Sequence, residues 1–332
     1  MIAGNELARW LRDRKAQRET GETMEEVAGR LRRLPCLERL GDGLEFAQSQ
    51  GMEAVMALAE TFVAAPGAIA EVLEVLVAAA RDDPYFRPHF DVESSEVHSG
   101  LLLFDRPALS LTLAVMRADA IAAKRAERKG GASLTFPGRR KAFHFLRSGG
   151  AILSLWEAPG IGPGFTADTS GRCRFVERWR IEDGEKLDLD GRRFTFIVEE
   201  AERDIVFVGA ETSLGAGPLS VEYDSATLRF AGASSTDEAS SRIQMMLALL
   251  RMMDRRDATP LFAEMLRSEL FYARWQTMRE FLALDPGAAL PHLRRMASGD
   301  PHSEVRRVAA QTLAQLVAEE SADREEPVPC PC

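Results

Sequence analysis

The sequence predicts an α+β chain of several parts: helices at the N-terminus, an antiparallel β domain in the middle and a helical repeat at the C-terminus. Apolar residues recur at helical spacing from Asn5 to about Arg81. Strand-like runs separated by turn signals follow from about Val92 to Ser234, and a repeating helical pattern comes after them. The expected parts are residues 1–88, 89–236 and 237–318, with a disordered tail over 319–332.

The N-terminal part is expected to hold several amphipathic helices. Val27, Leu31 and Leu34 fall at the spacing that lines one helix face. Pro35 and the Pro66-Gly67 pair are expected to separate consecutive helices.

The middle part contains many short strand-like runs. They cover residues 101–104, 109–116, 132–136, 142–146, 151–156, 174–181, 193–200, 204–211, 219–223 and 227–231. One stretch, Ala118 to Lys129, is expected to be a short charged helix instead. Many short strands at this spacing are typical of an antiparallel sandwich or barrel.

The stretch from Asp183 to Arg193, with its Asp183-Gly184 and Asp190-Gly191 turns and a following hairpin that reaches Val206, resembles the cupin or jelly-roll class. The resemblance implies eight strands closed into two sheets. It also implies a barrel whose mouth holds a ligand.

The C-terminal part carries a repeat with a step of 32 residues. The segments that begin at Val305, Ala273 and Ser241 align, so that Arg306, Arg274 and Arg242 share one column. Partner helices are expected near 260–268 and 288–297. The run from Gly299 to Val317 resembles the second helix of a HEAT repeat, which implies helix pairs stacked into an array.

The arginine column has two interpretations. Arg242, Arg274 and Arg306 could form a ladder that binds an acidic protein partner. Alternatively, each arginine bonds the turn of its neighbour and spaces the repeats, as regular stacking alone would require.

A metal-binding cupin needs clustered histidines, usually two that lie one residue apart, and this sequence has no such pair. His98 and His144 would have to converge across the sheets, with Glu96 or Glu157 as the carboxylate, to form an iron-type site. The interpretation preferred here is that they are ordinary surface or core histidines, so that no cofactor is expected and a divalent metal remains the alternative.

No nucleophile or phosphate-loop motif is present, which favours a non-enzymatic protein. Cys173 could be an activated thiol between two arginines or a strand residue of the core. The Arg139-Arg140-Lys141 run could form part of an anion site or an exposed hairpin tip.

The net charge of −9 argues against a nucleic-acid partner, and no apolar run is long enough to span a membrane. Few, scattered cysteines and the lack of a secretory signal favour a cytoplasmic protein, and the Arg- and Ala-rich composition favours a bacterial one. Cys330 and Cys332 in the tail could bind a soft metal, receive a lipid, or have no role.

Two functions follow from this reading. The first is a protein-interaction scaffold that uses the HEAT-like surface. The alternative is a cupin-type protein that binds a small ligand or works as a metal-dependent enzyme with a non-standard pocket.

Overall fold

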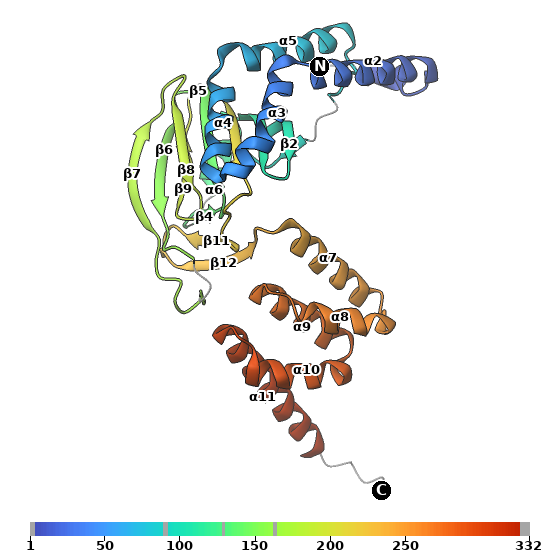
Figure 1. Cartoon of the computed structure of the whole chain (residues 1–332), viewed down its shortest axis with the longest axis vertical. Helices are drawn as coiled ribbons and strands as arrows, with labels where there is room; N and C mark the ends of the chain where they lie inside the picture. The colour runs from blue at the N-terminus through green and yellow to red at the C-terminus, as the bar shows by residue number, and fades with distance from the viewer. Residues whose placement is uncertain (1–3, 89–91, 128–129, 162–164, 326–332) are drawn as a thin grey trace. The chain divides into compact units, whose positions relative to one another are not determined.

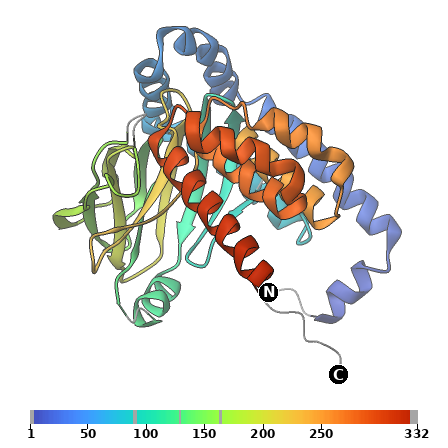
Figure 2. The same cartoon turned by 90° about the horizontal axis from the view of Figure 1, so that it is seen from below.

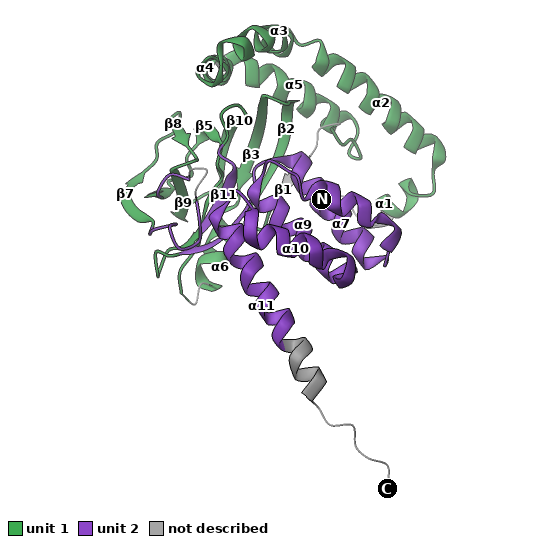
Figure 3. Ribbon diagram, turned by 60° about the horizontal axis from the view of Figure 1, so that its bottom comes forward, with its two compact units in different colours: residues 1–158, 173–216, 223–229 green, residues 159–172, 217–222, 230–332 purple. Residues whose placement is uncertain are grey.

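The structure, a computed structural model, describes residues 4–88, 92–127, 130–161 and 165–325. The chain divides into two compact units, shown in green and purple in Figure 3. The first comprises residues 1–158, 173–216 and 223–229, and the second comprises residues 159–172, 217–222 and 230–332.

Six helices belong to the first unit. They are α1 (Gly4–Trp10), α2 (Arg14–Arg32), α3 (Pro35–Gln50), α4 (Met52–Ala64), α5 (Pro66–Asp82) and α6 (Ala118–Glu127). The Asp13 side chain caps α2 by accepting hydrogen bonds from the backbone N–H groups of Lys15 and Ala16, both at 3.0 Å. Gly51, with φ of 101°, turns the chain between α3 and α4.

The first unit also holds two antiparallel sheets. Their strands are β1 (Val92–Ser94), β2 (His98–Arg106), β3 (Leu109–Met116), β5 (Arg140–Arg147), β6 (Ile152–Glu157), β7 (Arg174–Arg180), β8 (Lys186–Asp190), β9 (Phe194–Glu200) and β10 (Ile205–Thr212). One sheet has the order β1-β2-β3-β10-β5-β8 and the other β7-β6-β9. A further strand, β4 (Ser133–Phe136), contacts β9. The predicted antiparallel middle region is therefore confirmed, with β1 and β8 in addition to the expected runs.

The six-stranded sheet is covered on both faces. Its outer face packs on α2–α5 through a large apolar core that includes Leu40, Val55 and Leu111 (Figure 1, Figure 2). Its inner face faces the smaller sheet through a second core with Leu153 and Phe207. The helices expected as a separate part over residues 1–88 therefore belong to the same unit as most strands, because they bury the sheet's outer face.

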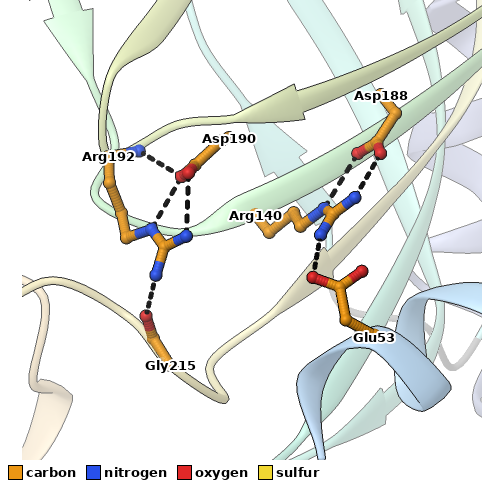
Figure 4. A network of polar contacts seen from close by, with 6 residues as sticks. All are labelled: Glu53, Arg140, Asp188, Asp190, Arg192 and Gly215. Atoms are coloured by element: carbon orange, nitrogen blue, oxygen red, sulfur yellow. Dashed lines mark hydrogen bonds and ion pairs between the residues drawn. The ribbon is translucent and has the colours of Figure 1, made fainter.

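A charged contact ties α4 to the outer face of β5. Arg140 pairs with Glu53 of α4, and its guanidinium also binds both carboxylate oxygens of Asp188 on β8 at 3.2 and 2.6 Å (Figure 4). Beside it, Arg192 pairs with Asp190 at 2.7 and 2.8 Å and donates to the backbone carbonyl of Gly215. Arg140 is 21% exposed, so this pair is partly shielded from solvent.

The second unit is mainly helical. Its elements are β11 (Leu219–Asp224), whose last two residues return to the first unit, β12 (Phe230–Ser235), α7 (Glu238–Met252), a 3-10 turn (Arg256–Ala258), α8 (Thr259–Met265), α9 (Phe271–Leu284), α10 (Pro286–Gly299) and α11 (Ser303–Glu325). Helix α9 contacts α7 on one side and α10 and α11 on the other, while α8 contacts α10 (Figure 1). The core between them contains Phe262, Met278, Phe281, Leu293 and Ala309.

The arginine column has a repeated contact. Arg274 donates to the backbone carbonyls of Ser268 and Glu269, and Arg306 donates to those of Asp300 and Pro301, six and five residues earlier in both cases. Each arginine therefore bonds the turn that precedes its own helix. Contacts at the same offsets show that α9 and α11 repeat one local design after 32 residues.

Two features differ from the expected boundaries. Helix α11 continues to Glu325, beyond the expected start of the tail at residue 319. Cys330 and Cys332 lie outside the described residues. Taken alone, none of the described helices has the length and apolarity needed to cross a membrane; Met52–Ala64 and Gly67–Asp82 meet that requirement only as a pair, which is bent by 62°.

Candidate functional site

A cavity of about 500 Å³ lies within the first unit, lined by β2, β3, β5 and β10 of the large sheet and by β9. Its walls follow the pairing register of the large sheet. At one end, Glu211 of β10 lies between Ser110 of β3 and Lys141 of β5, and Leu189 of β8 lies beyond Lys141. Arg139, which directly precedes β5, joins this polar end.

The next rows of the sheet are apolar. Gly209 lies between Thr112 and Phe143, and two residues further along β10 the ring of Phe207 lies beside Ala114. Gly209 has no side chain, so its row leaves open space in the wall. The register therefore gives the cavity a charged end and an aromatic end.

The charged end is a cluster of three groups. Arg139 binds Glu211 at 2.8 Å, and Lys141 binds the other oxygen of the same carboxylate. Their side chains are 30%, 32% and 23% exposed for Arg139, Lys141 and Glu211 respectively, which places the cluster partly out of solvent. Burial raises the pKa of Glu211, but Lys141 and Arg139 outweigh burial and the net pKa shift is downward. Glu211 is therefore ionised, and the cluster carries one excess positive charge.

The aromatic end is built from three phenylalanines. The ring of Phe143 lies 5.1 Å from that of Phe196 in a T-shaped arrangement and 5.8 Å from that of Phe207. Phe196 comes from the smaller sheet, so the two sheets meet around this cluster. Such rings bury large apolar area and favour a flat or aliphatic ligand body.

The two histidines singled out from the sequence are not brought together. His98 lines the cavity, and its Nδ1 lies 2.6 Å from the Ser95 hydroxyl. His144 lies on the opposite face of β5, where its Nδ1 donates to the carbonyl of Val63 on α4 at 3.0 Å. The alternation of β5 explains the separation, because Phe143 faces the cavity and its neighbour must face the helices.

The two carboxylates considered with them are also engaged elsewhere. Glu96 is exposed and pairs with Lys124 at 3.0 Å. Glu157 is buried and pairs with both Arg174 and Arg193. The proposed convergence of histidines and carboxylates is therefore corrected by the structure.

A metal of the kind that the cupin resemblance implies does not fit this cavity. Its described lining offers one histidine, His98, together with Asp105 and Glu211, and Glu211 is already bound by two cations. Within the described ranges, no group of three or more His, Cys, Asp or Glu residues could hold a metal ion. We derive no metal-dependent step for this site.

The arginine column is placed in full by the structure. Arg274 is buried and binds both carboxylate oxygens of Asp300, at 2.8 and 2.7 Å. Arg306 bonds its own turn, and Arg242 is exposed and pairs with Glu238. This geometry matches the spacing interpretation for Arg274 and Arg306, and leaves only Arg242 free to face a partner.

The cavity residues were partly accessible from the sequence. The Arg139-Arg140-Lys141 run was a candidate anion site, but the strand separates it, since Arg140 faces α4 on the outer face. Glu211 was missed, and the only signal for it was a charged residue in an otherwise apolar strand. Cys173 is a core residue, because it is buried and burial raises its pKa.

No protein-family model matches the chain, and no curated protein matches it. Among solved structures it is similar to an ectoine synthase from P. lautus, with 14% identity, a TM-score of 0.22, and coverage of 37% of this chain and 68% of that one. A cupin domain from Schizosaccharomyces pombe has 9% identity, a TM-score of 0.22, and coverage of 36% and 64%. A sugar phosphate isomerase from a cupin superfamily, from Silicibacter pomeroyi, has 12% identity, a TM-score of 0.23, and coverage of 45% and 87%.

The chain spans less than two thirds of the length of that cupin domain. At these scores the similarities carry no argument about what the chain binds or does, so the function is argued from the cavity.

Proposed function

We propose that the first unit binds a small organic anion in the cavity between its sheets, with the anionic group at the charged end and an apolar body against the phenylalanines. The observation that carries the proposal is the cluster in which Arg139 and Lys141 share the single carboxylate of Glu211. A second carboxylate, brought by a ligand, would balance the excess positive charge in this partly shielded place.

The shape of the cavity supports the same assignment. A volume of about 500 Å³ lies within the range of small-molecule sites, and an apolar wall with a few convergent polar groups is typical of them. Hydroxyl groups of Ser110, Thr112 and Thr135 line the wall and add hydrogen-bonding capacity. Asp105, the other acidic group of the lining, is exposed and lies across β3 from Glu211, so it does not cancel the positive charge at the cluster.

The residues support binding rather than catalysis. Glu211 is held ionised by its two partners, and His98 lies at the far row of the sheet, paired in register with Met116. We therefore assign no reaction to the cavity. The finer proposal for the strand region is a cupin-like binding domain that does not use the family's metal.

Calorimetric titration with 3-phenylpropanoate and with its uncharged amide tests this function. We expect the acid to bind and the amide to bind at least about tenfold more weakly, because one charge-assisted hydrogen bond contributes roughly 1.5–3 kcal/mol. Lys141→Gln and Arg139→Gln should weaken binding of the acid alone. The matched control is Arg140→Gln, on the same strand and on the opposite face, which should leave affinity unchanged.

Two results would contradict the proposal. One is equal affinity for the acid and the amide. The other is a loss of affinity in Arg140→Gln as large as the loss in Lys141→Gln.

We propose as a second candidate that α7–α11 form a HEAT-like array that presents a surface to a protein partner. The specific observation in its favour is a stripe of exposed apolar side chains on α7. Affinity capture with the full chain and with a Leu249→Glu variant tests this role. Recovery of the same proteins in the same amounts by both forms would remove it.

A further inference from the structure

Helix α7 exposes five large apolar side chains in one stripe. Met245 and Met252 are 73% exposed, Met246 is 63%, Met253 is 57% and Leu249 is 55% exposed. At 100° per residue these positions span about 120° of the helix surface, the width of an apolar stripe that faces a core. Isolated exposed apolar residues are ordinary, but a contiguous group of this size marks an interaction site.

The opposite face of α7 already has its neighbours. Leu247 is 1% exposed and belongs to the core of the second unit, and α7 contacts α9. The exposed stripe is therefore a second apolar face, additional to the one that holds α7 in its unit.

The repeat shows what this second face is built to contact. A step of 32 residues carries Met245, Met246, Leu249 and Met252 onto positions of α9 that are all buried. Those positions are Thr277, Met278, Phe281 and Leu284, with exposures of 2%, 0%, 1% and 3%.

On α9 this face packs against the preceding helix, since Phe281 lies 5.5 Å from the ring of Phe262 on α8. Among the described helices of the second unit, α7 is the first, so the same face of α7 has no preceding helix in the array. The stripe continues the internal helix–helix interface by one more layer.

The stripe is symmetric about its centre. Relative to Leu249, the other four residues lie at −4, −3, +3 and +4, and all four are methionines. If two copies of α7 packed antiparallel about a twofold axis at Leu249, Met245 would face the position of Met253, and Met246 that of Met252. A surface that maps onto itself in this way is the requirement for an isologous dimer.

The flanking charges do not oppose such a pair. Arg242 and Arg256 lie seven residues on either side of Leu249, so a twofold axis brings them near one another. Arg242 pairs with Glu238 and Arg256 pairs with Asp254 on its own chain, which neutralises both ends. Methionine side chains are flexible and adapt to irregular contacts, which suits a seam of four of them.

We infer that the exposed stripe of α7 binds the same stripe of a second copy of this chain, as an antiparallel helix pair about a twofold axis at Leu249. This inference rests on the proposed interaction role of the helical array and names its partner. It is independent of ligand binding in the cavity.

Sedimentation velocity of the full chain over a wide concentration range tests the inference. The wild type should form a dimer, and Leu249→Glu should raise its dissociation constant at least about 30-fold, as expected for a residue at the centre of an interface. Phe46→Glu is the matched control, because Phe46 is 72% exposed on α3 of the first unit and should leave the dimer intact. Circular dichroism establishes that each variant is folded.

Site-directed oxidation tests the symmetry directly. In a background with Cys330→Ser and Cys332→Ser, Leu249→Cys should form a disulfide-linked dimer, because the twofold axis brings this position onto itself. Met245→Cys should not link to itself, because in an antiparallel pair it faces position 253. Linkage of Met245→Cys in place of Leu249→Cys would overturn the antiparallel arrangement.

A wild type that stays monomeric at every concentration would overturn the second copy as partner. If a different protein were still captured by the wild type and lost with Leu249→Glu, the interaction role of the array would stand without the dimer. If no protein were captured, both would fall.

Discussion

Substitution of Arg274 by methionine is expected to lower the free energy of unfolding of the second unit by about 3–5 kcal/mol, the cost of removing one partner from a buried ion pair. Arg274 and Asp300 have side chains that are 8% and 4% exposed. Without the guanidinium, Asp300 would keep the backbone N–H of His302 at 2.8 Å as a donor. The carbonyls of Ser268 and Glu269 would lose theirs, so the turn before α9 would also be weakened.

The repeat offers a matched control. Arg242 occupies the equivalent position on α7, but its side chain and that of Glu238 are both 72% exposed. Arg242→Met should therefore change stability by less than about 0.5 kcal/mol. Adding Asp300→Asn to Arg274→Met removes the unpaired charge and should restore about 1–3 kcal/mol.

Urea unfolding with hydrogen exchange read on peptides from α9 to α11 measures this effect within the second unit. Equal losses in Arg274→Met and Arg242→Met would refute the argument that burial of the pair, and not the position in the column, determines its contribution. An Asp300→Asn substitution that gave no recovery in the Arg274→Met background would refute it as well.

Gly100→Ala should destabilise the first unit by about 1–3 kcal/mol, because an added Cβ would lie 2.6 Å from Cγ2 of Thr112, whereas Gly209→Ala, with no contact under 3.6 Å, should be tolerated; thermal unfolding of the two variants compares them. Phe145→Ala should cost about 3–5 kcal/mol in urea unfolding, since this ring is 2% exposed in the core between the sheets, and a loss below about 1 kcal/mol would contradict that placement. Burial lowers the pKa of His302, so the unfolded chain takes up a proton first as the pH falls below about 6.5, and stability of the second unit should decrease from that pH downward. His302→Phe should remove this part of the pH dependence, and an unchanged pH profile would count against it.

The elements were predictable where one local pattern dominates. The runs that became β3 and β10 have several β-branched and apolar residues between turn signals, and the short charged segment became α6. Strand β8, Lys186–Asp190, was seen only within a longer stretch, because its charged residues hide its alternation. The 32-residue step was readable because the arginine contacts repeat at fixed offsets.

The cavity was not predictable from local pattern. Lys141 and Glu211 meet because β5 and β10 pair in one particular register, and these residues are far apart in the sequence. The face of His144 was hidden for a related reason. Both faces of β5 are covered, by Phe145 on one side and by Ala142 against the helices on the other, so hydrophobicity does not alternate along this strand.

The division into units was also beyond the sequence. The N-terminal helices have the apolar faces of an independent bundle, but those faces cover a sheet that lies later in the chain. Amphipathic spacing shows that a helix has a partner and does not show which element the partner is.

A crystal structure of the full chain with 3-(4-bromophenyl)propanoate tests the central claim most directly, because the bromine marks the ligand by anomalous scattering. We expect the carboxylate within hydrogen-bonding distance of Arg139 or Lys141, and the bromophenyl ring among Phe143, Phe196 and Phe207. Bromine density elsewhere on the chain, or a carboxylate directed away from both cations, would contradict the account.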